Sequence, residues 1–273
     1  MPELPEVETV RTDLENRLAG RRISSMHIYR HRLRRPIPAD LPQLVAKRKV
    51  RAVRRRAKYL LIDFVNGSMI VHLGMSGSIR ADRACDALRK HDHVQWRCSG
   101  QLLRYNDPRR FGMIDWSPDQ DSSRLLTNCG VEPLSGSFST EFMYRVTRKR
   151  KIAIKALLMD SSLIAGIGNI YACETLFAAS IRPSTPAGAL NRQQCKAIVA
   201  AAKKILKAAI KAGGSTLRDY TFGSEKTGYF QFAHKVYGRA GEPCRKCKTP
   251  IMHSRIGGRS TFFCPQCQPT IPT

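Results

Sequence analysis

The first three residues of the chain, Met1-Pro2-Glu3, place a possible nucleophile beside an acid. If Met1 is removed, Pro2 becomes the N-terminus and its secondary amine lies next to the Glu3 carboxylate. A terminal amine titrates near pH ~8, so a fraction of it is unprotonated at neutral pH and can attack a sugar or carbonyl carbon. The resulting iminium stays charged and withdraws electrons, which divides one difficult reaction into two easier steps. The alternative is a proline-containing leader before a helix, because such short motifs also occur by chance.

Four of the cysteines form two close pairs near the C-terminus, Cys244-x2-Cys247 and Cys264-x2-Cys267. This spacing predicts that four thiolates hold one structural Zn²⁺ per chain. Two disulfides are the alternative, but they are uncommon in a reducing compartment. Between the pairs, two strand-like runs flank a Gly-Gly turn, which indicates a zinc ribbon with Arg259 at the tip of its hairpin. The other five cysteines are scattered and are expected to be buried thiols: Cys85, Cys98, Cys129, Cys173 and Cys195.

The charge of the chain points to a polyanionic partner. Its 273 residues hold 47 Lys and Arg against 21 Asp and Glu, a net charge of +26. Nucleic acid is the first candidate and an anionic membrane surface the second. No apolar run approaches the roughly 20 residues of a membrane span, and the acidic N-terminus does not resemble a secretory signal. These features predict a cytoplasmic or nucleoid-associated protein.

Two runs of basic residues, 47–58 and 145–155, could contact such a partner. Most of the first run is expected to be a solvated strand face. Lys58 differs, because it directly precedes the apolar run 59–65 and therefore lies at the mouth of a strand. The second run overlaps the start of a short predicted helix and contains Lys151 and Lys155.

Three polar, turn-rich segments bounded by strands are expected to be functional loops. Gly74-Met75-Ser76-Gly77 presents an apolar tip, and Asn106 to Gly112 contains the pair Arg110-Phe111. Apolar wedges and arginine can fill a duplex from which a base has been extruded; ordinary core packing is the alternative for Met75 and Phe111. His91-Asp92-His93 offers metal-ligating side chains, but a third ligand is not evident.

The elements that must position these residues fall into an α+β multidomain pattern. Helical spacing of apolar residues runs from Pro5 to Gly20, so the N-terminal amine would lie at the start of a helix. Short strands follow as far as Trp116, with hairpin turns at Asn66-Gly67 and Ser99-Gly100. Residues 2–130 are therefore predicted to form a helix-led β-sandwich domain.

A helical domain is predicted for residues 140–229, after a turn-prone linker at 131–139. Its helices are expected at 152–159, from the Gly-x-Gly-Asn turn at 166–169 to Phe177, and at 191–212. The turn would expose backbone N–H groups to a phosphate, with Asn169 adding a side-chain donor. Residues 215–229 read as a loop that could close over a ligand, and 236–270 would form the zinc ribbon.

Taken together, the motifs resemble those of the bacterial formamidopyrimidine-DNA glycosylase family, over nearly the whole chain and in the family's order. The matching segments are Met-Pro-Glu-Leu-Pro-Glu-Val-Glu-Thr at 1–9, Arg-Arg-Ala-Lys-Tyr-Leu at 55–60, His-Leu-Gly-Met-Ser-Gly at 72–77, Lys-His-Asp-His at 90–93, Asp-Pro-Arg-Arg-Phe-Gly at 107–112, Gly-Ile-Gly-Asn-Ile-Tyr-Ala at 166–172, Val-Tyr-Gly-Arg at 236–239 and the cysteine pairs. The family is expected to fold as a helix-led β-sandwich, a helix–two-turn–helix domain and a four-cysteine zinc ribbon.

The resemblance implies a monomeric base-excision-repair enzyme that acts on double-stranded DNA containing oxidised bases, with no membrane partner. It implies removal of oxidised purines, chiefly 8-oxoguanine and formamidopyrimidines, followed by strand cleavage through β,δ-elimination. By matched position, Pro2 is the nucleophile at C1′ and Glu3 its acid/base partner. Lys58 is the proton donor for β-elimination and Arg259 the donor for δ-elimination.

The resemblance also implies a DNA interface. Met75, Arg110 and Phe111 match the trio that fills the gap left by the flipped base, and residues 215–229 match the lesion-recognition loop. Other positions that match DNA contacts are His91, Lys151, Lys155 and Asn169. The chain departs from the family at Cys129 and Val131, and at Ser161-Ser162, none of which is a catalytic position.

Three alternatives remain open from the sequence. An endonuclease VIII-type enzyme for oxidised pyrimidines shares the Pro2-Glu3 start, but typically has Gly where this chain has Leu4. A non-catalytic zinc-ribbon DNA-binding protein would explain the charge and the cysteines, but not Pro2 or Lys58. A membrane-surface protein would need an amphipathic helix with exposed aromatic residues, which the sequence lacks.

Overall fold

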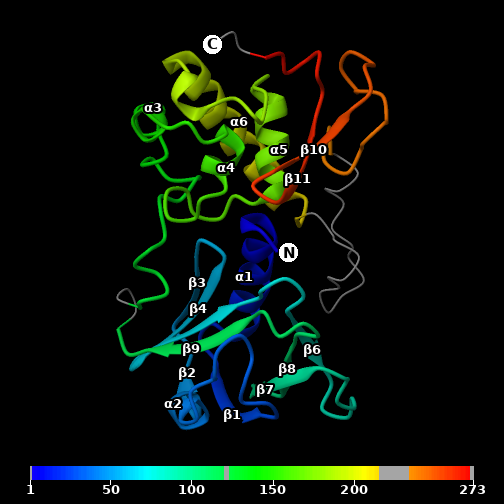
Figure 1. Ribbon diagram of the computed structural model, residues 1–273. Coiled ribbons are helices and arrows are strands. Elements are labelled where there is room, and N and C mark those ends of the chain that lie inside the picture. The colour runs from blue at the N-terminus through cyan, green and yellow to red at the C-terminus, as the bar shows by residue number, and fades with distance from the viewer. Residues whose placement is uncertain (1, 120–122, 215–233, 271–273) are drawn as a thin grey trace. The chain divides into compact units, whose positions relative to one another are not determined.

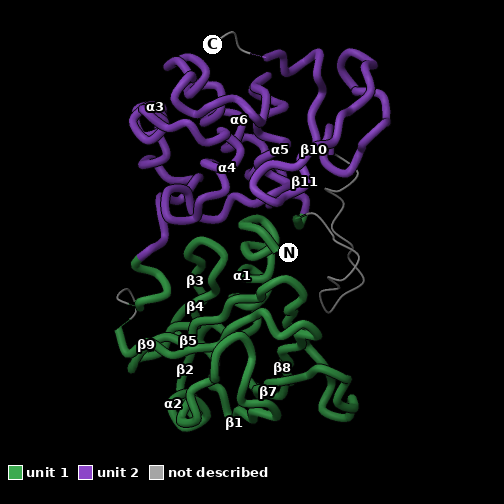
Figure 2. The backbone as a smooth tube through the Cα atoms, viewed as in Figure 1, with its two compact units in different colours: residues 1–127, 213–229 green, residues 128–212, 230–273 purple. Residues whose placement is uncertain are grey.

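The computed structural model describes residues 2–119, 123–214 and 234–270. The chain divides into two compact units (Figure 2). Unit 1 comprises 1–127 with 213–229, and unit 2 comprises 128–212 with 230–273. In the described residues, no helix is long and apolar enough to cross a membrane.

Helix α1 (Leu4–Leu18) opens unit 1 and buries one complete face. Leu4, Val7, Val10, Leu14 and Leu18 are all at most 1% exposed, as their spacing of three and four residues predicts. Gly20, with φ of +78°, follows the helix end, a conformation that glycine adopts without steric cost. The helix predicted from Pro5 to Gly20 is confirmed.

Two antiparallel sheets follow α1 in unit 1 (Figure 1). One has the strand order β2-β1-β7-β8-β6 and the other β3-β4-β5-β9. The strands are β1 (Arg22–Ile28), β2 (Arg48–Lys49), β3 (Ala52–Arg56), β4 (Tyr59–Phe64), β5 (Gly67–His72), β6 (Ser78–Asp82), β7 (Asp92–Cys98), β8 (Gln101–Asn106) and β9 (Met113–Ser117), with the short helix α2 (Leu41–Val45) after β1.

Both predicted hairpins are present. In the first, Phe64 of β4 pairs with Gly67 of β5. In the second, Cys98 of β7 pairs with Gln101 of β8. Ser99 and Gly100 between them both have positive φ, which suits the right-handed twist of paired strands.

The main hydrophobic cluster of unit 1 joins its layers. It contains the buried face of α1, Trp96 and Tyr105 from the first sheet, and Phe64 and Val71 from the second. Because side chains from both sheets meet in one cluster, the sheets form the predicted β-sandwich.

Unit 2 is built from helices α3 (Thr140–Thr147), α4 (Ile154–Leu158), α5 (Asn169–Ala178) and α6 (Arg192–Lys211), with a short 3₁₀ turn η1 (Ala187–Ala189). The Asn191 side chain accepts the N–H of Gln194 at 2.9 Å and so caps α6. Gly213 and Gly214 follow the end of α6 with φ of +79° and +83°. The three predicted helices are thus found within a few residues of their expected bounds.

Residues 131–139, predicted as a turn-prone linker between domains, lie within unit 2. Val131 bridges Ile164, and the ring of Phe138 is fully buried in the helical core. Ser139 caps α3 by accepting the N–H of Phe142. The small, turn-prone residues therefore build a packed loop of unit 2, whose first residue is Asn128.

The C-terminal ribbon of unit 2 is a two-stranded hairpin of β10 (Met252–Ile256) and β11 (Arg259–Phe263). Gly257 and Gly258 form its turn, both with positive φ. A separate small cluster, with Val236, Ile251, Cys244 and Cys264, packs beneath it. The predicted ribbon is confirmed, with Arg259 at the first position after the turn.

Candidate active site and nucleic-acid interface

Pro2 and Glu3 are buried at the start of α1. Glu3 is the N-cap residue, and its backbone N–H donates to Glu6 Oε2 at 2.8 Å. This bond belongs to a capping box, which fixes the direction in which the chain enters the helix. The cap holds the backbone beside Pro2 in one conformation and engages the Glu6 carboxylate in doing so.

Lys58 lies in the turn between β3 and β4, at the same end of unit 1 as Pro2. Arg55 of β3 donates to Glu8 in the second turn of α1 at 2.7 Å. Farther along, Glu15 accepts the N–H of Val53. These two contacts show that α1 and β3 run in opposite directions. The β3–β4 turn therefore lies at the N-terminal end of α1. The three expected catalytic residues of unit 1, Pro2, Glu3 and Lys58, therefore share one end of the sandwich.

His72 is a residue of this region to which the sequence analysis assigned no role. It is the last residue of β5, pairs with Tyr59 next to Lys58, and accepts the N–H of Gly74 on Nδ1 at 3.0 Å. Burial, then the positive charges of Lys58 and Arg34, lowers the pKa of His72 from 6.5 to about 4. His72 is therefore neutral at physiological pH and adds no positive charge beside Lys58. Its only sequence signal was its place in the motif that contains Met75.

Asp107 joins the two loops that carry the expected gap-filling residues. Its carboxylate, fully buried, accepts the Ser76 hydroxyl at 2.6 Å and the N–H of Gly112 at 2.8 Å. The hydroxyl of Tyr105 approaches the same carboxylate at 3.4 Å. Ser76 in turn accepts the N–H of Arg109 at 3.2 Å. A buried carboxylate needs such donors, and satisfying it ties the 74–77 turn to the 107–112 loop.

The close approach of these loops depends on two glycines. A Cβ on Gly74 would lie 2.5 Å from the backbone of Phe111 and Gly112, and φ at Gly74 is +65°. A Cβ on Gly112 would lie 1.7 Å from the Tyr105 hydroxyl. Larger side chains would separate the loops, so glycine is required at both positions.

The structure brings Met75, Arg110 and Phe111 together on these joined loops. Met75 is 38% exposed and Phe111 45%, which excludes core packing for either side chain. Arg109 stacks over the Phe111 ring at 4.8 Å from its centroid. Arg110 has φ of +55°, an unusual conformation for arginine that often accompanies function.

His91 lies beside a hollow of about 460 Å³ that Arg110 also lines. The backbone of His91 has φ of +73°, and its carbonyl accepts the N–H of Asp107 at 3.1 Å. Next to it, Asp92 is held by Arg80 at 2.6 Å. Burial alone would raise the pKa of Asp92, but the hydrogen bonds from Arg80 and Asn106 lower it. His91 thus sits on a rigidly held segment.

His91-Asp92-His93 is not a metal site. Asp92 is occupied by Arg80, and His93 Nε2 bonds the Asp107 carbonyl at 2.8 Å. Among the described residues, the group of ligating side chains close enough for one ion is the four cysteines.

In unit 2, Asn169 lies at the start of a helix and Lys151 lies on the surface. Asn169 is the first residue of α5, after Gly168, where N–H groups and the helix dipole favour an anion. Its side-chain Oδ1 is buried and has no hydrogen-bond partner among the described residues. Lys151 is exposed.

Lys155 differs from the expectation that it contacts DNA. It is fully buried, and its Nζ donates to the Ser260 carbonyl at 2.8 Å and to Thr261 Oγ1 at 2.7 Å. The ammonium is occupied inside unit 2, because burying it without acceptors would be costly. It holds β11 directly after Arg259.

A second buried charge fixes the segment that leads into the ribbon. Glu174 of α5 accepts the backbone N–H groups of Lys235, Val236 and Tyr237, at 2.9–3.1 Å. Together, Lys155 and Glu174 attach the ribbon to the helices of unit 2.

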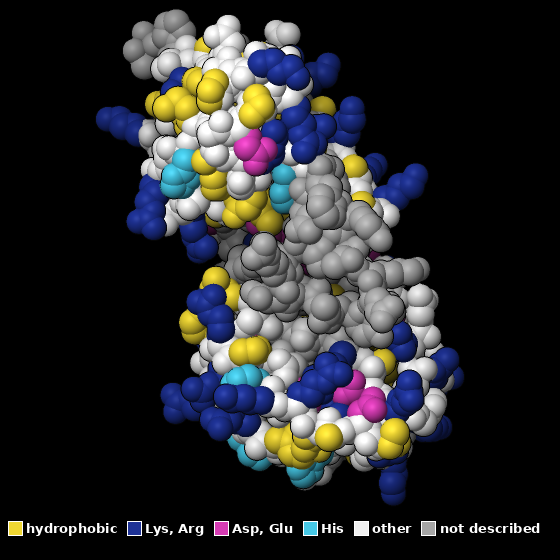
Figure 3. All heavy atoms as spheres, turned by 90° about the vertical axis from the view of Figure 1, so that its right-hand side faces the viewer, with side chains coloured by type: hydrophobic (Ala, Val, Ile, Leu, Met, Phe, Trp, Pro, Cys, Tyr) yellow, Lys and Arg dark blue, Asp and Glu magenta, His cyan; other side chains and the backbone are white. Residues whose placement is uncertain are grey.

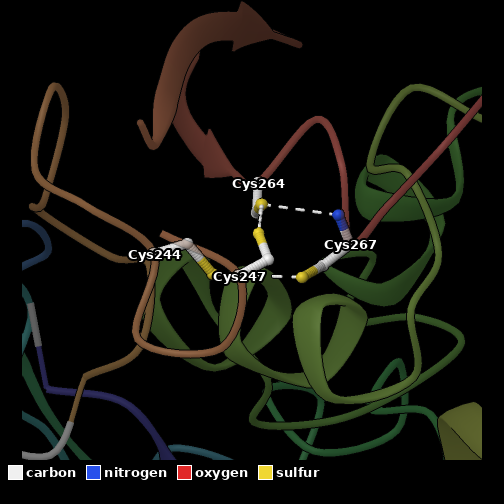
Figure 4. Close-up of side chains that lie close together, drawn as sticks. All are labelled: Cys244, Cys247, Cys264 and Cys267. Atoms are coloured by element: carbon white, nitrogen blue, oxygen red, sulfur yellow. Dashed lines mark hydrogen bonds between the residues drawn. The ribbon is translucent and has the colours of Figure 1, made fainter. Parts of the chain in front are cut away.

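The four ribbon cysteines converge on one point (Figure 4). Their Sγ atoms lie within 4.8 Å of one another, with 3.4 Å between Cys247 and Cys264 and 3.9 Å between Cys244 and Cys267. A disulfide would need about 2.05 Å, whereas sulfur atoms bound tetrahedrally at about 2.3 Å from zinc lie about 3.8 Å apart. Backbone N–H groups of Lys246 and Cys267 point at Cys244 and Cys264 Sγ at 3.4 Å. The cysteines form a structural zinc site.

The chain combines a helix-led β-sandwich, a helical domain in which the N-terminus of α5 suits a phosphate, and a zinc ribbon. This combination defines a DNA glycosylase of the helix–two-turn–helix class. Family models agree: residues 1–114 match the formamidopyrimidine-DNA glycosylase N-terminal domain, 129–221 its H2TH domain, and 241–270 the zinc finger found in FPG and IleRS. The chain belongs to the formamidopyrimidine-DNA glycosylase family and is a DNA-repair enzyme.

Individual relatives match over almost their whole length. Formamidopyrimidine-DNA glycosylases of Aromatoleum aromaticum and Acinetobacter baylyi are 48% and 47% identical, covering 98% of this chain and 99% and 98% of theirs. The solved MutM (FPG) protein from Thermus thermophilus has a TM-score of 0.88 at 36% identity, covering 99% of this chain and 100% of its own. A mutant FPG protein of Lactococcus lactis, solved with Fapy-dG containing DNA, has a TM-score of 0.91 at 33% identity, covering 98% of this chain and 100% of its own.

Proposed function

We propose that this enzyme removes oxidised purines, 8-oxoguanine and formamidopyrimidines, from double-stranded DNA and then cleaves the strand. The observation that carries the proposal is the capped N-terminus of α1, which holds Pro2 and Glu3 at the same end of the sandwich as Lys58. With Met1 removed, the Pro2 nitrogen attacks C1′ of the damaged nucleotide. The bond from C1′ to the base breaks, and the base leaves with the bonding electrons and a proton.

Glu3 is the acid/base partner in this step. It adjoins Pro2 in the chain, and both Glu3 and Glu6 take part in the capping box that fixes this end of α1. Protonation by Glu3 assists opening of the sugar ring, and loss of the ring oxygen from C1′ leaves the iminium between Pro2 and the sugar.

The iminium makes the C2′ proton acidic, so the 3′ phosphate can be eliminated. Lys58 assists this β-elimination and Arg259 the following δ-elimination, which releases the 5′ phosphate.

DNA contacts are proposed for both units. Met75, Arg110 and Phe111 would fill the gap left by the extruded nucleotide. Their exposure supports this role, and so does the Asp107 carboxylate that joins their two loops. His91, Lys151 and Asn169 would bind phosphates. Lysine and arginine side chains are widespread on the face shown in Figure 3, where acidic side chains are few. Such surfaces bind DNA with an affinity that falls steeply with salt.

The lesion-recognition loop expected at 215–229 lies outside the described residues. Gly214, which precedes it, lies against Glu6, since a Cβ there would be 3.1 Å from the Glu6 side chain. Gly214, the last described residue before the expected loop, therefore lies beside the α1 N-terminus, which supports the proposed role of the loop in recognising the base. The enzyme is further proposed to be a monomer that works in the cytoplasm on chromosomal DNA.

Borohydride trapping tests the proposal. The enzyme is incubated with duplexes that contain 8-oxoguanine or thymine glycol, and the covalent adduct is measured. We expect adduct with 8-oxoguanine, and its loss in Pro2→Gly and in protein that retains Met1. Equal trapping by Pro2→Gly would contradict the role of Pro2. Preferential trapping of thymine glycol would instead identify an enzyme of the oxidised-pyrimidine type.

A further inference from the structure

A strongly basic hollow lies in unit 1 away from the proposed active site. It measures about 550 Å³, and five cationic side chains line it: Arg22, Lys47, Arg48, Lys49 and Arg51. Its remaining lining residues are Ala46 and Val65. No acidic residue lines it in the described part of the chain, and the proposed reaction uses none of these side chains.

Two independent elements separate the hollow from Pro2 and Lys58. Helix α1 spans 15 residues, or about 22 Å at 1.5 Å per residue. Its C-terminal end is joined to the hollow, because Gly20 N–H donates to the Val50 carbonyl at 2.9 Å. Strand β4 runs from beside Lys58 to beside Val65, and seven residues of extended chain cover about 23 Å. The hollow therefore lies about 20 Å from the nucleophile.

The five cations are not neutralised within the described structure. Their neighbours Arg54 and Arg55 pair with Asp63 and Glu8, whereas no ion pair with a carboxylate involves any of the five. The frame of the hollow is nevertheless fixed. Arg22 Nη1 donates to the Lys47 carbonyl at 3.0 Å, and Lys47 N–H donates to the Ile23 carbonyl at 2.6 Å.

Protection of a sheet edge explains only part of this charge. β2 is the edge strand of its sheet, and lysine or arginine on an edge prevents pairing with another chain. That role needs Arg48 and Lys49, which form β2. Three further cations line the same hollow but lie outside β2: Arg22, Lys47 and Arg51. Protection of the edge strand does not explain their positive charge, which requires another reason.

We propose that this basic hollow binds the phosphate backbone of a second DNA segment while the active site holds the first. A duplex presents one negative charge per ~1.7 Å of its axis, so several phosphates can face the five cations at once. A membrane surface fits less well, because Ala46 and Val65 are the only apolar side chains among the lining residues. Contact with two segments would let the enzyme pass directly from one stretch of DNA to another during its search.

The inference rests on the proposed function for its test, which uses enzyme already trapped on one lesion duplex. The trapped complex is titrated with a second, undamaged duplex carrying a different fluorophore, and anisotropy gives the dissociation constant. Charge reversal at Arg48→Glu and Lys49→Glu should weaken the second binding at least tenfold. A matched pair in α6, Lys204→Glu and Lys207→Glu, changes the net charge equally and should leave it within about twofold.

The salt dependence adds a second measurement. Neutral variants Arg48→Gln and Lys49→Gln should reduce the slope of log K against log salt by about 2, since each phosphate contact contributes about 0.9. Failure to trap the first duplex would contradict the proposed function. Two outcomes would overturn the inference although the first duplex is trapped normally. One is that no second duplex binds, and the other is that the variant pair in the hollow and the variant pair in α6 weaken its binding equally. Binding of phosphatidylserine vesicles in place of the second duplex would also overturn it.

Discussion

The Ser76 hydroxyl donates to Asp107 Oδ1 at 2.6 Å, across 31 residues of sequence. Gly112 N–H occupies the other carboxylate oxygen at 2.8 Å. Neither Ser76 nor Asp107 is expected to touch DNA, yet together they set the spacing of the Met75 tip and the Arg110-Phe111 pair. The proposed gap-filling device is therefore assembled from two loops by one buried carboxylate.

Replacing Asp107 should disable that device with little change to the sandwich. In Asp107→Asn, an amide group takes the place of one acceptor oxygen and cannot accept from both Ser76 and Gly112. Hydrogen bonds to a charged group contribute about 1.5–3 kcal/mol each, so we expect kcat/KM on an 8-oxoguanine duplex to fall at least tenfold. Strand cleavage at an abasic site in single-stranded DNA, where no gap needs filling, should fall much less. The exposed Asp40→Asn is the control, and a uniform loss on both substrates would contradict the prediction.

Lys155 and Lys151 should behave differently although both were expected to contact DNA. Lys155→Met leaves the Ser260 carbonyl and Thr261 Oγ1 without their buried donor, at a cost of about 1–3 kcal/mol for each group. We expect a lower thermal midpoint and a larger fraction of β- over δ-elimination product. Lys151→Met should leave the midpoint unchanged and weaken binding to damaged and undamaged DNA alike. Identical profiles for the two variants would refute the positioning role.

Arg259→Ala should separate the two halves of strand cleavage. The side chain is exposed directly after the ribbon turn, so its removal should not disturb the zinc site. We expect normal release of 8-oxoguanine and accumulation of the β-elimination product on denaturing gels. Equal loss of base release and δ-elimination would show that Arg259 acts earlier in the reaction.

The pKa of His72 predicts a stability change in weak acid. Its pKa is about 4 in the folded protein and 6.5 without the fold, so the unfolded chain binds more protons between these values. Stability should therefore rise with pH across this window, with a total change of about 3 kcal/mol from this group. His72→Gln should flatten the dependence of urea unfolding on pH from 4 to 6.5. The control variant His27→Gln, at an exposed position, should leave the pH dependence of unfolding unchanged. The same flattening in both variants would exclude His72 as the cause.

Chelation should release one Zn²⁺ per chain and loosen the ribbon, because four thiolates without metal cannot hold the hairpin. Zinc release is measured with a colorimetric indicator, and DNA affinity by anisotropy before and after. We expect weaker DNA binding that returns on adding zinc. Release of no zinc from protein purified in zinc-containing medium would refute the metal assignment.

The sequence predicted those features that depend on local patterns. The apolar spacing of α1, the Asn66-Gly67 and Ser99-Gly100 turns, and the cysteine pairs each lie within a short window. The structure bears all of them out. Pro2 and Glu3 also stood out as adjacent residues, but their catalytic roles came from the family resemblance and stay a prediction.

Features that depend on distant partners could not be read in advance. Lys155 belongs to a basic run, and only its contacts with Ser260 and Thr261, more than 100 residues later, show that it faces inward. In the sequence, Asp107 was noted only as one residue of the motif at 107–112, with no role assigned to its carboxylate. Residues 131–139 have the composition of a linker, but the burial of Phe138 in the helical core makes them part of unit 2.

The burial of Pro2 has a consequence for how the enzyme matures in the cell. The proposed role of Pro2 requires removal of Met1, yet Pro2 is buried at the start of α1. N-terminal domains begin to fold during synthesis, so the processing aminopeptidase competes with folding of the nascent chain. Molecules that fold first would keep Met1 and remain inactive while otherwise native. Rapid overproduction should therefore yield a mixture, in which the trapping-competent fraction equals the fraction whose N-terminal residue is proline.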